Sequence, residues 1–118
     1  MSKINESIVS VTIDGDTIAL RCNLRNVQTV NARFGGLTPL QQAFGRQDMD
    51  AIAFTLMECG GLRAEEKRAF PQRLFRNGIT NDLLLELYKF SYMLYNGGRL
   101  PPEPGDEEPA EETPEGNG

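Results

Sequence analysis

The stretch from Thr80 to Tyr95, TNDLLLELYKFSYMLY, contains the longest apolar run of the chain, and the rest of the protein is expected to pack around it. Thr80 suits a helix N-cap and Asn96-Gly97-Gly98 is a typical C-terminal stop, so the pattern predicts one helix. At 100° per residue its apolar side chains form two stripes, whereas an ordinary surface helix has one. The first stripe is Leu83, Leu87, Phe90 and Leu94, and the second is Leu84, Leu85, Tyr88, Tyr92 and Tyr95.

The second stripe has two interpretations that the residues alone leave open. It can be core, which would make this the central helix of a small domain, or it can be presented to a partner. Three of its members are tyrosines, which tolerate half-exposed sites and are common at interfaces. The candidate partner-binding residues are therefore Leu84, Tyr88, Tyr92 and Tyr95, together with Phe54 from an earlier segment.

The N-terminal part of the chain predicts a β-hairpin. Residues 8–13 and 17–22 alternate between apolar and polar side chains, and Asp14-Gly15 between them is a strong turn signal. A two-residue loop places Val11 opposite Ile18 and Val9 opposite Leu20, whereas a three-residue loop would place Val9 opposite a charged Arg21. We expect the two-residue loop, and the free edges of such a hairpin offer a route to self-association.

Three further segments have helical signals. Asn23 can cap a helix over residues 24–34 whose buried face is Leu24, Val27, Val30 and Phe34. Thr38-Pro39 predicts the start of a short helix that stops at Gly45, because proline is favoured at the first helical position. Asp48 can cap a helix over residues 49–59, from which Phe54 points away on a face shared with Asp50, Ala51 and Glu58.

Residues 63–76 are rich in positive charge. Pro71 is expected to end or restart a helix within this segment, with Phe70, Leu74 and Phe75 as apolar anchors. The basic side chains form either a solvated face or a docking site for an acidic segment, including the chain's own tail. The members of this basic patch are Arg63, Lys67, Arg68, Arg73 and Arg76.

The 118 residues suit one domain, and the net charge of −5 is unevenly divided along the chain. Residues 97–118 carry a charge of −6 and are rich in proline and glutamate, so we expect a disordered acidic tail. Residues 1–96 carry +1, which gives no field to attract nucleic acid. The predicted organisation is a flexible N-terminus (1–6), a single α+β domain (7–96) with a hairpin and about four to five helices, and the tail.

Catalytic and metal-binding patterns are missing from the sequence. There is no histidine, and neither serine nor cysteine stands in a nucleophile motif. Two cysteines, Cys22 and Cys59, form neither a disulfide framework nor a zinc site and are expected to be small buried residues. We therefore expect no enzyme activity, no cofactor and no metal. The sequence has no signal-peptide pattern and no apolar run that would span a bilayer, so it predicts a cytoplasmic protein without membrane contact.

The order of elements and several local residues resemble the small tail assembly chaperones of gene transfer agents and long-tailed bacteriophages. In that family a hairpin with a turn glycine leads into an amphipathic helix that ends at Phe-Gly, followed by a short leucine-containing segment, a second helix, a glycine break and a closing helix. The resemblance covers roughly residues 8–96. The matching residues are Asp14-Gly15, Val27, Val30, Phe34-Gly35-Gly36-Leu37, Leu40, Ile52, Ala53, Leu56 and Gly60-Gly61-Leu62.

The resemblance implies a non-catalytic function in bacteriophage, prophage or gene transfer agent assembly. Such proteins bind the long tape-measure protein, keep its apolar helices soluble, help recruit tail-tube subunits, and leave before the tail is complete. In some members a frameshifted long form carries a tube-binding extension. Two other classes stay open: a structural tail or connector component that remains in a phage-like particle, and a small regulatory protein-binding module that uses residues 63–76.

Overall fold

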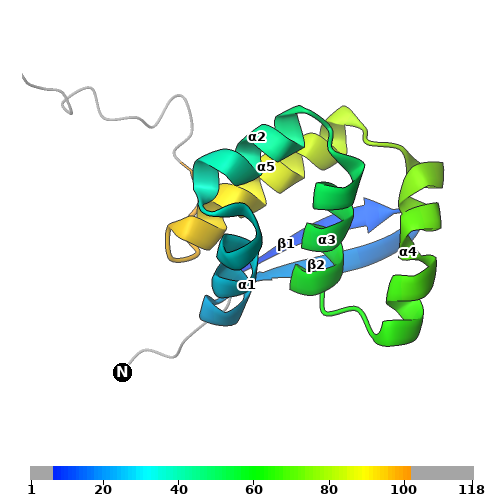
Figure 1. Cartoon of the computed structure of the whole chain (residues 1–118), viewed down its shortest axis with the longest axis horizontal. Coiled ribbons are helices and arrows are strands. Elements are labelled where there is room, and N and C mark those ends of the chain that lie inside the picture. Colours follow the sequence, from blue (N-terminus) through cyan, green and yellow to red (C-terminus); the bar gives the residue numbers. More distant parts are fainter. Residues whose placement is uncertain (1–6, 102–118) are drawn as a thin grey trace, which may run out of the picture.

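The computed structural model describes residues 7–101 and has an α+β fold in which a two-stranded antiparallel hairpin precedes the helices. The hairpin consists of β1 (Ser7–Ile13) and β2 (Asp16–Cys22). The helices are α1 (Leu24–Phe34), α2 (Leu37–Gly45), α3 (Met49–Cys59), α4 (Ala64–Asn77) and α5 (Asn81–Tyr95), arranged as in Figure 1. The predicted fold class is confirmed. Within residues 7–101, no helix has the length and apolar character needed to cross a membrane.

The hairpin has the predicted two-residue loop. Val11 pairs with Ile18 and Val9 pairs with Leu20. Asp14 and Gly15 both have positive φ, 52° and 89°, as a tight hairpin turn of the primed type requires. The alternation therefore places one set of side chains in the core and leaves the opposite face exposed. The buried set is Val9, Val11, Ile13, Ile18 and Leu20.

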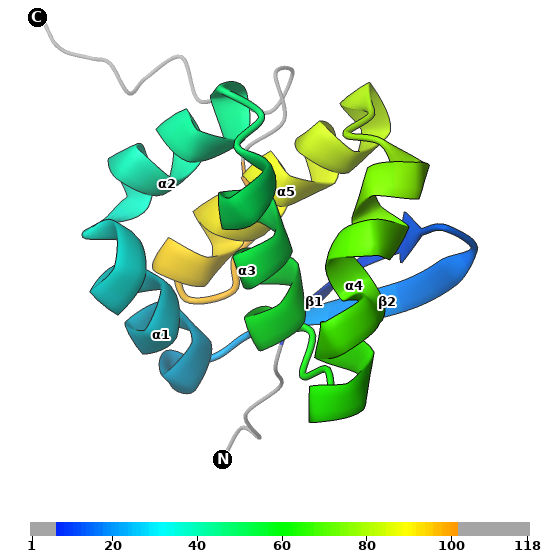
Figure 2. The same cartoon turned by 45° about the vertical axis from the view of Figure 1, so that its right-hand side comes forward.

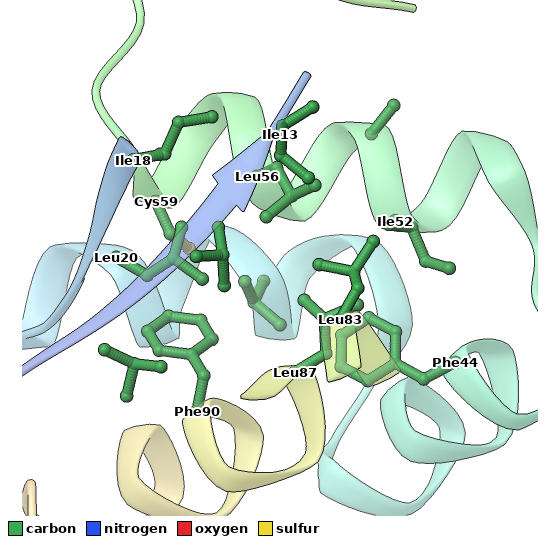
Figure 3. Packing of buried hydrophobic residues seen from close by; sticks show 14 of the residues in the cluster. Ile13, Ile18, Leu20, Phe44, Ile52, Leu56, Cys59, Leu83, Leu87 and Phe90 are labelled. Carbon is green, nitrogen blue, oxygen red and sulfur yellow. The ribbon is translucent and has the colours of Figure 1, made fainter. Parts of the chain in front are cut away.

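The core lies between this face of the hairpin and the helices, and Figure 3 shows Leu83, Leu87 and Phe90 of α5 pointing into it. The whole first stripe of α5, Leu83, Leu87, Phe90 and Leu94, is at most 6% exposed. The hairpin, α2 and α3 supply side chains that surround it, including Leu20, Phe44, Ile52 and Leu56. The prediction that the chain packs around residues 80–95 is confirmed for the hairpin, α1 and α2, whereas α4 packs on α3 and β1 and not on α5.

Local capping signals placed most helix boundaries correctly. The side chains of Asn23, Asp48 and Thr80 accept hydrogen bonds from the backbone N–H groups three residues later, and α1, α3 and α5 begin directly after them. The predicted start of α2 is wrong by two residues, because the helix begins at Leu37 after Gly36 and Pro39 lies inside its first turn. The missing N–H of Pro39 costs nothing there, since first-turn donors have no intrahelical acceptor.

The predicted buried face of α1 is only partly right. Val30 is buried and Val27 and Phe34 are half-buried, but Leu24 is 69% exposed. Asn26 is buried instead, and its side-chain amide donates to the carbonyl of Arg21 at the end of β2, 2.8 Å away. A buried amide needs such a partner, so this bond sets the rotation of α1 and turns Leu24 to solvent.

The predicted break at Pro71 is wrong, because α4 runs unbroken from Ala64 to Asn77. Proline removes one helical hydrogen bond and crowds the preceding turn. Here Phe70 and Leu74, on either side of Pro71, are at most 1% exposed and hold both halves of the helix against the core. Figure 2 shows α4 crossing in front of the hairpin near its turn.

The two ends of the domain meet. The Ser7 hydroxyl donates to the carbonyl of Gly98, 2.9 Å away, and the Gly98 N–H donates to the carbonyl of Met93, 2.8 Å away. The first residues after α5 are thus bonded to the start of β1. The predicted flexible N-terminus (1–6) lies outside the described part of the chain, and so do residues 102–118 of the predicted disordered tail (97–118).

Candidate interaction surfaces

Two members of the second stripe of α5, Tyr88 and Tyr95, contact α2 and α1. The Tyr88 ring stands edge-on to Phe44 with centroids 6.2 Å apart, and its hydroxyl donates to the carbonyl of Gln41, 3.4 Å away. The Tyr95 hydroxyl donates to Asn31 Oδ1, 3.0 Å away, and burial raises the pKa of Tyr95. Both tyrosines are half-buried and have intramolecular partners, so much of their contact surface is already used within the domain.

The two remaining α5 candidates are also half-buried. Leu84 packs against the hydrophobic core from its edge. The backbone carbonyl of Tyr92 accepts a hydrogen bond from the Asn96 side chain, 2.8 Å away. Neither side chain presents a full apolar face to solvent in the folded domain.

Phe54 contacts α1. Its ring stands edge-on to Phe34, with centroids 6.0 Å apart, and the Arg33 guanidinium lies 4.6 Å from the Phe54 ring centroid. Phe54 is half-buried, and Ala51, predicted to share an outward face with it, is buried. This stack of two rings and a guanidinium is of a kind that contributes to stability in its own right.

The basic patch is largely paired within the domain. Arg73 forms an ion pair with Asp16, and the Arg76 Nη2 atom lies 2.6 Å from Asp14 Oδ2. Both acids flank Gly15 in the hairpin turn, so the last turns of α4 are attached to the tip of the hairpin. The Asp14 N–H also donates to Asn77 Oδ1, 2.9 Å away.

The N-terminal half of the basic patch is neutralised in the same way. The Lys67 Nζ atom lies 2.9 Å from Glu58 Oε2 on α3, and the Arg63 Nε atom lies 3.9 Å from Glu66 Oε1. Arg68 is the one member without an acidic partner among residues 7–101. Since four of the five cations already have a carboxylate, the segment offers an acidic partner less charge than its sequence suggests.

Among residues 7–101, the large apolar side chains that are exposed to solvent are not the predicted partner-binding residues. Phe75 in the last turn of α4 is 69% exposed, and Leu85 in the second turn of α5 is 66% exposed. On a helical wheel Leu85 lies opposite the first stripe, so its exposure could have been predicted from the sequence. Phe75 was expected to anchor α4, but Phe70 and Leu74 do so. Leu24, at 69%, and Leu100, at 66%, are exposed to the same extent, and Ile8 is 46% exposed.

The two cysteines are free, with Cys22 half-buried and Cys59 only 1% exposed. Burial, followed by the nearby charges of Cys22 and Glu58, raises the pKa of Cys59 to about 12. Burial raises the pKa of Cys22 to about 11. Both thiols are therefore protonated and poorly nucleophilic near neutral pH. Within residues 7–101, no three cysteine, aspartate or glutamate side chains are grouped as metal ligands.

The buried thiol of Cys59 makes the free energy of unfolding depend on pH in the alkaline range. Below about pH 8.5 the thiol is protonated in both the folded and the unfolded chain, and its contribution is constant. Above that pH the unfolded chain releases the proton while the folded chain keeps it, so the free energy of unfolding falls by up to about 1.4 kcal/mol per pH unit. Urea denaturation of the wild type and Cys59→Ala between pH 8 and 10.5 should show a shallower pH slope for the variant. Equal slopes would contradict burial of a neutral thiol.

Comparison of the chain with protein families, curated proteins and solved structures finds no match.

Proposed function

We propose that this protein is a non-catalytic tail assembly chaperone of the phage type, which acts in the bacterial cytoplasm. It binds the tape-measure protein and helps to recruit tail-tube subunits. The observation that carries the proposal is the exposure of Phe75 and Leu85, 69% and 66%, on a domain whose core is otherwise well buried. The resemblance of residues 8–96 to this family is the reason for naming the tape-measure protein as the client.

The chemistry of such a chaperone agrees with these residues. A protein that keeps apolar helices soluble needs apolar contact points that stay exposed, and a frame stable enough not to collapse over them. Phe75 and Leu85 flank the short connection between α4 and α5. Phe70, Leu74, Leu83 and Leu87 hold the same two helices in the core, at 4% exposure or less. The exposed pair can therefore take part in binding without loss of the fold.

The proposal is tested by co-expression with the tape-measure protein encoded in the same genome. The tape-measure protein should be insoluble when expressed alone, and should become soluble and co-purify with the full 118-residue chain. A matched run with an unrelated acidic protein of similar size controls for a general effect of co-expression on solubility.

Two outcomes would contradict the proposal. The first is a tape-measure protein that stays insoluble in the presence of the chain. The second is the presence of the chain in purified finished particles, which would favour a structural tail or connector component.

A further inference from the structure

A hollow of about 380 Å³ lies along β1, between this strand and the start of α5. Val11 and Leu83, each 4% exposed, are its apolar lining residues. Ser10 and Thr12 of β1 line one side, and Asp82 and Glu86 of α5 line the other. In Figure 1 the hairpin runs behind α3, with α5 beside it. The volume is within the range of small binding pockets, and one wall is a strand.

The strand wall has unused hydrogen-bonding groups. Ile13 and Asp16 flank the two-residue turn and form a hydrogen-bonded pair, so such pairs recur at Val11 and Val9. The N–H and C=O groups of Ser10 and Thr12 therefore point away from β2, to the side of the hollow. Within residues 7–101, β2 is the only strand that pairs with β1. This edge can accept one more strand.

The charge of the hollow is negative. Asp82 is exposed in the first turn of α5 and has no ion-pair partner among residues 7–101. Glu86 forms one ion pair, with Lys89 Nζ 3.2 Å from its Oε1 atom, and no cation lines the hollow itself. An incoming strand with lysine or arginine side chains would meet two carboxylates, one of them without an internal partner.

We propose that β1 takes up an extended basic segment of a partner protein as a third strand of the sheet. Backbone groups of Ser10 and Thr12 bond to the segment, and every second side chain of the segment faces α5. Lysine or arginine at those positions reaches Asp82 and Glu86. Phe75 and Leu85 do not line this hollow, and the inference does not depend on a role in tail assembly.

Charge argues against two other occupants. A second copy would offer its own β1, SIVSVTI, which carries no cation for the two carboxylates. The chain's own residues 102–118 contain seven acids and no base, so Asp82 and Glu86 would repel them. A basic segment from another protein can both form hydrogen bonds with the open edge of β1 and neutralise Asp82 and Glu86.

The probe for the test is a capped eight-residue peptide of alternating lysine and valine, titrated into the full-length protein at low salt. We expect saturable binding that weakens as salt is added, because the contacts are ionic. Backbone amide resonances of Ser10 and Thr12 should shift most. The matched peptide has glutamate in place of lysine and should not bind. Failure of the lysine peptide to bind at millimolar concentration would overturn the proposal.

Two variants locate the binding site. Ser10→Pro removes an N–H that faces the hollow and leaves the β1–β2 bonds intact, so affinity should fall at least about tenfold. Thr17→Pro is the matched control, because Thr17 pairs with Thr12 and its N–H faces the opposite edge. Equal affinity for Ser10→Pro and the wild type would overturn the proposal, as would an equal loss in both folded variants.

The charge contacts supply a test that does not depend on a proline. Asp82→Asn with Glu86→Gln should weaken the lysine peptide about tenfold, whereas Asp50→Asn, in the first turn of α3, should not. The comparison of the Asp82→Asn, Glu86→Gln double variant with Asp50→Asn tests the proposed site even if Ser10→Pro fails to fold. Sedimentation that showed a dimer dissociated by either the salt or the charge variant would assign the edge to a second copy and overturn the proposed occupant.

Discussion

Phe90→Ala should lower the free energy of unfolding by about 3–5 kcal/mol, because the ring is fully buried and its removal leaves a cavity at the centre of the core. A domain of this size has a total stability of about 5–15 kcal/mol, so the variant should be partly unfolded under mild conditions. Urea denaturation followed by circular dichroism measures the difference.

The control for this substitution lies on the same helix. Leu85→Ala removes an apolar side chain that is 66% exposed and should change the free energy of unfolding by about 0.5 kcal/mol or less. Similar losses for Phe90→Ala and Leu85→Ala would contradict the burial of one face of α5 in the core. The contrast therefore tests the architecture and not only one contact.

Phe75→Ser with Leu85→Ser should weaken binding to the tape-measure protein roughly hundredfold, if the proposed function is right. Exposed apolar side chains that become buried at an interface each contribute about 1–2 kcal/mol, and the two together give that factor. The measurement is the amount of tape-measure protein that co-purifies, followed by titration with a soluble fragment of it.

The matched control is Gln72→Ser with Asn81→Ser, two exposed polar residues on the same helices. Both double variants should melt within a few degrees of the wild type, because none of the four side chains is in the core. Unchanged binding by the Phe75 and Leu85 variant would remove these side chains from the proposed interface. In that case the half-buried Tyr92 would be the next residue to substitute.

The two tyrosines Tyr88 and Tyr95 illustrate why a helix with two apolar stripes could not be interpreted from sequence. Their spacing correctly indicated that they share a face. Whether α2 and α1 or another protein covers that face depends on where those helices pack, which neither spacing nor composition reports. In the structure Phe44 packs edge-on against the Tyr88 ring, and Gln41 and Asn31 accept hydrogen bonds from the hydroxyls of Tyr88 and Tyr95.

The basic patch illustrates the same point for charge. Arg73 and Arg76 are about 60 residues from Asp14 and Asp16, with sequence separations of 57 and 62 for their hydrogen-bonded pairs. Residues 63–76 contain five cations and only two acids, Glu65 and Glu66. The acids that pair with Arg73 and Arg76 lie in the hairpin turn, and only the fold brings that turn to the end of α4. Coulomb interactions depend on distance in space, so local charge counts misjudged the free charge of this surface.

Short-range interactions made several features predictable from the sequence alone. The hairpin register follows from Asp14-Gly15 and side-chain alternation, and the starts of α1, α3 and α5 follow from the capping residues Asn23, Asp48 and Thr80. Each depends on residues a few positions apart. The tertiary structure decided the unbroken helix through Pro71 and the partners of the two tyrosines and of Arg73 and Arg76. These depend on contacts between distant segments, whose energies exceed the local preferences that they override.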